Sequence, residues 1–136
     1  MNQEFMSRFI FWTGVYNAGL ALILLCPPAY RALGLNICSP VWALLVAGFL
    51  AFTSAVLILS ARRLRQRASL VYWESLLRYA ACLVLVPAAM FGDVGLMAAP
   101  LGLGDLAIGL VYMFGLPKAL GVSHQALLFD RLGTAC

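Results

Sequence analysis

Four long apolar segments, separated by short polar or proline-bearing turns, constrain the fold of this chain more than any other feature. They cover residues 9–26, 41–60, 69–91 and 96–116. A helix needs about 20 mostly apolar residues, with a range of roughly 17–25, to cross the hydrocarbon core of a bilayer. Strands of a membrane barrel would instead alternate in polarity over about 10 residues. The sequence therefore predicts an all-α fold, a single-domain integral membrane four-helix bundle over residues 1–136.

The composition excludes a soluble protein of this size. Of the 136 residues, 64% are hydrophobic and 10% are charged, against roughly 45–50% and about 25% in an ordinary soluble domain. A small soluble domain leaves much of its surface exposed and could not bury so much apolar area. We therefore exclude a water-soluble enzyme, a disordered tail and a nucleic-acid-binding module, and we expect membrane lipid as a partner and no nucleic acid.

Prolines and polar turns mark the segment boundaries. Pro27 and Pro28 follow the first segment, Pro40 precedes the second, and Pro117 is expected to end the fourth because proline lacks an amide hydrogen. An arginine-rich turn separates the second and third segments, and residues 92–95 separate the third and fourth. These connections leave no room for a soluble domain. We expect the first segment to be an uncleaved helix, since no small-residue cleavage site follows it.

The basic residues predict which side of the membrane each loop occupies. With four spans, both termini share a side with the middle loop, and that side carries seven of the nine Lys and Arg: Arg8, Arg62, Arg63, Arg65, Arg67, Lys118 and Arg131. The opposite side carries Arg31, and Arg78 lies inside the third segment. Excess Lys and Arg mark the cytoplasmic face of membrane proteins. We therefore predict cytoplasmic termini and a multi-pass protein of the cell inner membrane.

Three ionisable residues lie within the apolar segments. Glu74 and Arg78 are four residues apart and share a face of the third helix, and Asp105 lies near the middle of the fourth segment. An ionised group at the bilayer centre costs about 2.5–3.5 kcal/mol on insertion scales, so such residues face the bundle interior and pair. At a rise of about 1.5 Å per residue, Asn17 reaches a depth similar to that of Arg78 and Asp105.

These depths predict a polar cluster formed by Asn17, Glu74, Arg78 and Asp105. Asp105 is expected to pair with Arg78, and Asn17 to satisfy the remaining guanidinium donors. Three glycines near Asp105, at positions 102, 104 and 109, are expected to let neighbouring backbones approach.

Two interpretations of this polar cluster remain open. It is either an ion-pair network that fixes helix order and register, or a polar pocket that binds a lipid-soluble molecule, a proton or a headgroup. With all three groups ionised it carries one excess negative charge. In that case either Glu74 is protonated, or it faces water or a cationic guest.

The sequence offers no catalytic residue and no metal site. Cys26 and Cys38 lie at the two ends of the first external loop, where a disulfide is permitted if the loop faces the periplasm. They are not spaced as a C-x-x-C redox motif. The single histidine, His124, lies outside the segments and has no metal-ligand spacing. No motif implies a cofactor, although a quinone or a lipid would suit an intramembrane pocket. A short helix capped by Ser123 is expected over residues 123–132.

Three short motifs resemble the DoxX-like group of small four-helix membrane proteins. They are TGVYN at residues 13–17, ARR at 61–63 and GDL at 104–106. The resemblance covers nearly the whole chain and implies the same four-helix membrane fold. The named members of the group are subunits associated with quinone-linked sulfur oxidation, and a chaperone-like role in receptor assembly also occurs among relatives. The resemblance transfers no catalytic residue to this chain.

The leading hypothesis is a non-enzymatic membrane bundle that acts as an accessory subunit of a membrane complex or binds a small lipid-soluble ligand. One alternative is a subunit of a quinone- or thiol-linked oxidoreductase, in which Cys26 and Cys38 would cycle; the absence of a histidine in any segment to ligate haem opposes it. Another is a small proton-coupled exporter working as a dimer, with Glu74 as the exchanging carboxylate. Arg78 would hold Glu74 ionised and opposes that role. Expected partners are other membrane subunits or a second copy of the chain.

Overall fold

The computed structural model describes residues 2–132, and within this range every regular element is a helix. The long helices are α1 (Gln3–Leu24), α3 (Pro40–Arg62), α4 (Leu64–Phe91) and α5 (Ala98–Leu120). Two helices are short, α2 (Pro27–Ala32) and α6 (His124–Leu128). The all-α prediction is confirmed, and one long helix corresponds to each predicted apolar segment.

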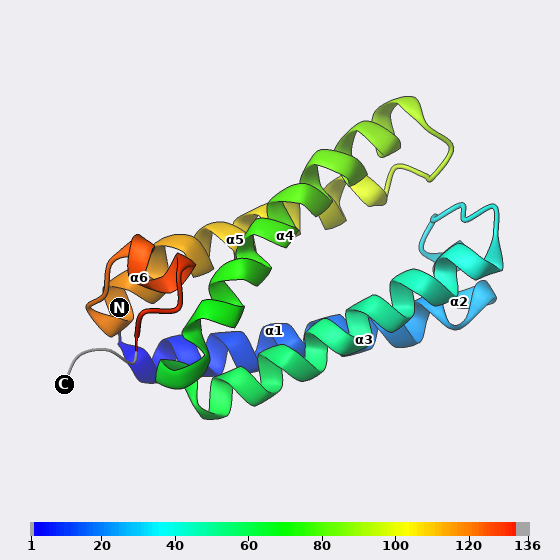
Figure 1. Ribbon diagram of the computed structural model, residues 1–136. Helices are drawn as coiled ribbons and strands as arrows, with labels where there is room; N and C mark the ends of the chain where they lie inside the picture. Colours follow the sequence, from blue (N-terminus) through cyan, green and yellow to red (C-terminus); the bar gives the residue numbers. More distant parts are fainter. Residues whose placement is uncertain (1, 133–136) are drawn as a thin grey trace.

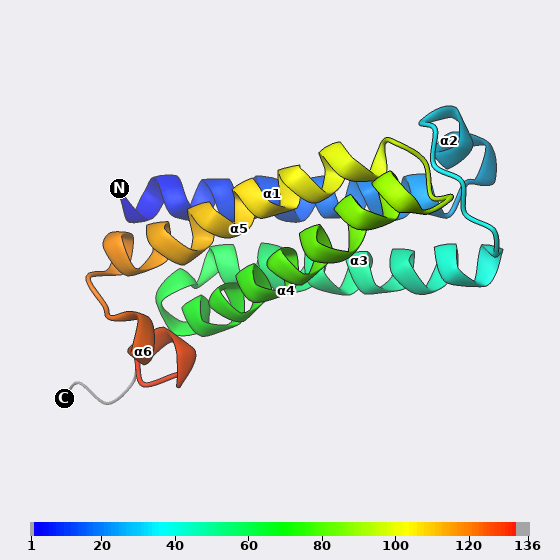
Figure 2. The same ribbon diagram turned by 90° about the horizontal axis from the view of Figure 1, so that it is seen from above.

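The long helices form two antiparallel pairs, α1 with α3 and α4 with α5, and each helix packs mainly against its pair partner. Figure 1 shows the two pairs as two layers, and Figure 2 shows α5 running over α1. The tight turn at Arg63 joins the layers, and α1 also contacts α5. Asn2, this turn and α6 lie at one end of the molecule, whereas α2 and the α4–α5 loop lie at the other (Figure 1).

Three helices, α3, α4 and α5, are long and apolar enough to cross a membrane. Helix α1 has 22 residues but is not among them, since Arg8, Tyr16 and Asn17 lower its mean hydropathy. Large apolar side chains point outward from all four long helices, among them Leu22, Phe52, Leu83 and Phe114. Such a surface is unfavourable in water and suited to lipid, so the structure supports a membrane protein.

A hydrophobic core fills the end of the bundle that holds α6. Every helix except α2 contributes buried residues to this core, including Met6, Ile10, Leu57, Val71, Leu116 and Leu127. The Ser123 side chain accepts a hydrogen bond from the Ala126 amide at 3.2 Å, which confirms the expected cap of the short tail helix. The Ser69 hydroxyl donates to Asp130 Oδ1 at 2.7 Å, and the Trp73 indole donates to the Leu128 carbonyl at 3.2 Å. These contacts hold α6 against α4.

Helix α2 closes the opposite end and was not anticipated from the sequence. Pro27 and Pro28 occupy its first positions, where a missing amide hydrogen costs nothing, so the prolines that stop α1 also start α2. Tyr30 packs into a second small core with Leu35 and Ala98. The Asn36 amide donates to the Val94 carbonyl at 2.8 Å and joins the two loops of this end.

Several helix ends differ from the predicted boundaries. The expectation that Pro117 ends the fourth helix is wrong: α5 passes through it and stops before Gly121, which adopts a left-handed conformation with φ of 66°. Pro117 lies so close to this end that its missing amide disrupts little. Helix α1 begins at Gln3 instead of residue 9, because the Asn2 side chain caps it at the Glu4 amide.

Gly14 sets the separation of α1 and α3, and this gives the first prediction. A Cβ atom at Gly14 would lie 2.8 Å from Ile58 Cγ1 and 3.2 Å from the Ser54 carbonyl oxygen. We expect Gly14→Val to lower the free energy of unfolding by about 1–3 kcal/mol, because the added methyls overpack the interface. Gly19→Val on the same helix is the matched control, since a Cβ there meets nothing within 4 Å. Thermal unfolding in detergent measures both; equal losses would contradict this role of Gly14.

Candidate functional site

The Arg78 guanidinium lies at the centre of the predicted polar cluster. Its side chain is 4% exposed, and Glu74, one turn earlier on α4, is 6% exposed. The Arg78 Nε group donates to Glu74 Oε2 at 2.9 Å, and Nη2 lies 2.8 Å from Oε1 of the same carboxylate. This two-bond pairing matches the planar fork of a guanidinium to the two oxygens of a carboxylate. The predicted i, i+4 contact is therefore present.

The same guanidinium connects α4 to two other helices. The Arg78 Nη1 group donates to Asp105 Oδ1 on α5, and Nη2 donates to Asn17 Oδ1 on α1 at 3.3 Å. The Asn17 amide in turn donates to Thr53 Oγ1 on α3 at 3.3 Å. The structure thus brings together all four residues that the depth argument selected, and Thr53 extends the contacts to the fourth long helix.

Tyr112 on α5 also belongs to this site, and the sequence argument missed it. The Arg78 Cζ atom lies 5.7 Å from the centroid of the Tyr112 ring, within the range of a cation–π contact. Tyr112 is fully buried. Thr13 lies beside it, but within the described part of the chain the Tyr112 hydroxyl makes no hydrogen bond of acceptable geometry. A signal was available, because a spacing of seven residues places Tyr112 on the same face of α5 as Asp105.

Asp105 differs from the other charged members of the polar cluster in its exposure. Its side chain is 23% exposed, and among residues 2–132 only its Oδ1 oxygen takes part in a hydrogen bond. Tyr16 on α1, itself 42% exposed, lies close enough to feel the charges of Asp105 and Arg78. Two carboxylates contact one guanidinium, so the polar cluster carries one excess negative charge when all three groups are ionised.

The three glycines near Asp105 have two different roles. A Cβ at Gly102 would lie 3.1 Å from Leu85 Cβ, and one at Gly109 would lie 3.0 Å from the Tyr79 ring. These two glycines let α4 and α5 approach, as expected. Gly104 does not serve packing, because a Cβ there would meet nothing within 4 Å. The expectation for Gly104 is wrong, and its missing side chain leaves open space next to Asp105 in the chain.

The two cysteines between α1 and α3 are free thiols in the structure. Cys26 and Cys38 are both exposed, and no disulfide joins them. Cys26 is the N-cap of α2, and the buried Tyr30 and the bond between Asn36 and Val94 hold this loop in place without a covalent link. Among residues 2–132, no three His, Cys, Asp or Glu side chains gather as metal ligands do.

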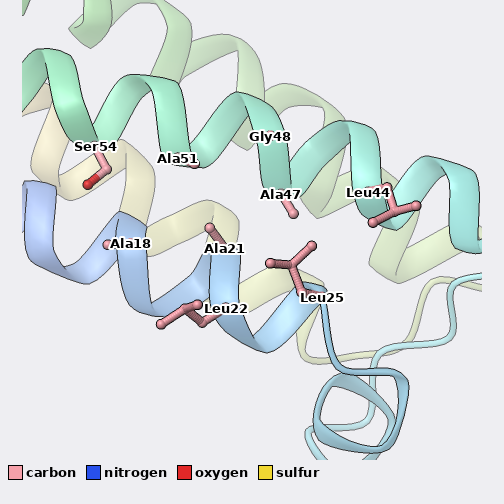
Figure 3. A pocket seen from close by; sticks show the side chains of 9 residues that line it. All are labelled: Ala18, Ala21, Leu22, Leu25, Leu44, Ala47, Gly48, Ala51 and Ser54. Atoms are coloured by element: carbon pink, nitrogen blue, oxygen red, sulfur yellow. The ribbon is translucent and has the colours of Figure 1, made fainter.

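An apolar groove of about 370 Å³ lies between α1 and α3. Figure 3 shows its lining of small residues and leucines from the two helices. The small residues are Ala18, Ala21, Ala47, Gly48 and Ala51. Ser54 is the polar member, and its hydroxyl already donates to the Gly14 carbonyl at 2.7 Å. The groove can offer only apolar contact, so the polar cluster is the stronger candidate for a functional site.

No protein-family model, no curated protein and no solved structure matches this chain. The fold and the site therefore define its class: a helical membrane protein with an ion-pair cluster buried between its long helices. The resemblance to the DoxX-like group stays a prediction.

The contact between Arg78 and Asp105 gives the second prediction. Arg78→Leu and Asp105→Leu should each destabilise the protein, because the first leaves the buried Glu74 carboxylate without its cation and the second leaves the Nη1 donor of Arg78 without its acceptor. Breaking such a pair costs about 3–5 kcal/mol in soluble proteins, and less where membrane contacts resemble the average of about 0.6 kcal/mol. The double variant should lose less than the sum of the two single losses. Unfolding of the four proteins in detergent measures this, and simple additivity would contradict a direct contact.

Proposed function

We propose that this protein is a non-enzymatic, four-span protein of the cell inner membrane that holds a small lipid-soluble ligand at the polar cluster. It does so alone or as an accessory subunit of a membrane complex. The observation that carries the proposal is a buried guanidinium matched by two carboxylates, one of which, Asp105, remains partly exposed. With both carboxylates ionised the polar cluster carries one excess negative charge, which is costly to bury and which a bound ligand can offset.

Three features support α1 as the fourth span. Its 22 residues reach about 33 Å at the usual helical rise, which matches the hydrocarbon core. It packs against α3, a candidate span. The polar residue at its centre, Asn17, is 2% exposed and bonded to Thr53 and Arg78, so lipid does not contact it.

Four spans place Asn2, the turn at Arg63 and α6 on one side of the membrane. The same end carries seven of the nine Lys and Arg, which supports its assignment to the cytoplasm.

This topology gives the third prediction. Gln66 is exposed in the first turn of α4, whereas Cys26 and Cys38 are exposed at the other end. In intact cells, a membrane-impermeant thiol reagent should label Cys26 and Cys38 in a Cys136→Ser background. In a Gln66→Cys variant that also carries Cys26→Ser, Cys38→Ser and Cys136→Ser, the same reagent should not label the introduced cysteine until the membrane is permeabilised. The reverse labelling pattern would overturn the assignment.

The fourth prediction tests ligand binding itself. Native mass spectrometry of gently extracted wild-type protein should show a co-purifying small molecule or lipid. The Arg78→Leu/Asp105→Leu double variant should fold and lose it, because the ligand has lost its polar anchors. Glu74→Gln should also reduce the amount of the co-purifying molecule. If Glu74 and Arg78 form only a structural pair, the change should have little effect. A folded double variant that carries the same molecule as the wild type, or a wild type that carries none, would show that the cluster is structural only.

A further inference from the structure

We infer that the ligand is a lipophilic monocation whose charge binds the free carboxylate oxygen of Asp105, on the turn of α5 where Gly104 leaves the surface open. This inference rests on the proposed function and names the chemical class of its ligand.

The distribution of hydrogen bonds shows where the missing positive charge belongs. Arg78 gives two bonds to Glu74 and one to Asp105. Glu74 is thus paired through both oxygens, whereas Oδ2 of Asp105 makes no hydrogen bond among residues 2–132. Arg78 repels a second cation, but the two negative charges of the carboxylates exceed its single positive charge by one. With both carboxylates ionised, a cation at Asp105 makes the site neutral, which a neutral or anionic ligand does not.

The titratable groups around Asp105 are one cation and three groups that are acidic or aromatic. Arg78 contacts Asp105, and Glu74, Tyr16 and Tyr112 lie within electrostatic range of it. Tyr16 presents a half-exposed aromatic ring, which attracts cations through its π face. The buried Tyr112 hydroxyl makes no hydrogen bond of acceptable geometry among residues 2–132, although Thr13 lies beside it.

Open surface for the apolar part of the ligand lies on the same turn of α5 as Asp105. A Cβ at Gly104 would meet no atom within 4 Å, and the neighbouring Leu103 side chain is exposed. In a membrane this surface contacts hydrocarbon, so a strongly hydrated ion cannot reach it without losing its water. A cation with an apolar body, such as a phosphonium or a protonated tertiary amine, reaches Asp105 through the lipid.

Tetraphenylphosphonium and tetraphenylborate test this inference, because they have the same shape and opposite charges. The full chain in lipid nanodiscs should bind tetraphenylphosphonium in calorimetry and should not bind tetraphenylborate. Asp105→Asn removes the charge and keeps a hydrogen-bond acceptor for Arg78, so we expect at least a tenfold loss of affinity for the cation.

Gly104→Leu tests the position of the ligand without touching a charge. A Cβ added at Gly104 would meet nothing within 4 Å, so the variant should fold. The leucine side chain should fill the open space and weaken cation binding at least tenfold. Gly48→Leu is the matched control, since its Cβ also meets nothing within 4 Å and it lies in the apolar groove on α3. It should keep the wild-type affinity.

The outcomes separate this inference from the proposed function. Preference for tetraphenylborate, or a loss of binding in Gly48→Leu instead of Gly104→Leu, would overturn the inference. A wild type that binds neither probe, yet carries a neutral lipid or quinone that the Arg78→Leu/Asp105→Leu variant loses, would overturn the inference and leave the proposed function standing. If the wild type binds neither probe and carries no co-purifying molecule, both the inference and the proposed function are overturned.

Discussion

A guanidinium buried inside a bilayer must find acceptors for its five N–H groups, since neither water nor lipid supplies them. The structure gives Arg78 four such contacts, two to Glu74 on α4, one to Asp105 on α5 and one to Asn17 on α1. A shift of α5 along α4 would separate Asp105 from the guanidinium, and a rotation of α1 would remove Asn17. Each movement leaves a charged donor without a partner, so this one side chain fixes the register of three helices, and Asn17 extends the constraint to Thr53 on α3.

The two helix pairs depend on different interactions. Within each pair, small residues allow close backbone contact: Gly14 against α3, and Gly102 and Gly109 against α4. Between the pairs, the polar contact of Arg78 with Asn17 and the edge-on contact of Phe9 with Tyr112 join α1 to the α4–α5 layer. The pairs are therefore tight units, and the polar cluster lies where they meet.

The sequence predicted the parts of this structure that follow from the cost of burying charge. Four apolar segments had to be helices, and Glu74, Arg78 and Asp105 had to meet because each would be unstable alone. The sequence did not reveal the role of Tyr112, because an aromatic residue in an apolar segment is equally suited to lipid contact or to core packing. Gly104 was misassigned for a related reason: a glycine that permits close packing and one that leaves open space are identical in sequence. Only the position of the neighbouring helix distinguishes them.

The choice of acceptors within the polar cluster bears on whether it is structural or functional. Asn17 accepts a hydrogen bond from Arg78 through a neutral amide, and Glu74 already balances the guanidinium charge through both of its oxygens. A third acceptor that served only to fix register could therefore be neutral too, and asparagine at position 105 would reach the same Nη1 group. The chain instead has an aspartate there, partly exposed and with one oxygen unused. Helix register explains the hydrogen bond of Asp105 but not its charge, and the charge is what a cationic ligand would require.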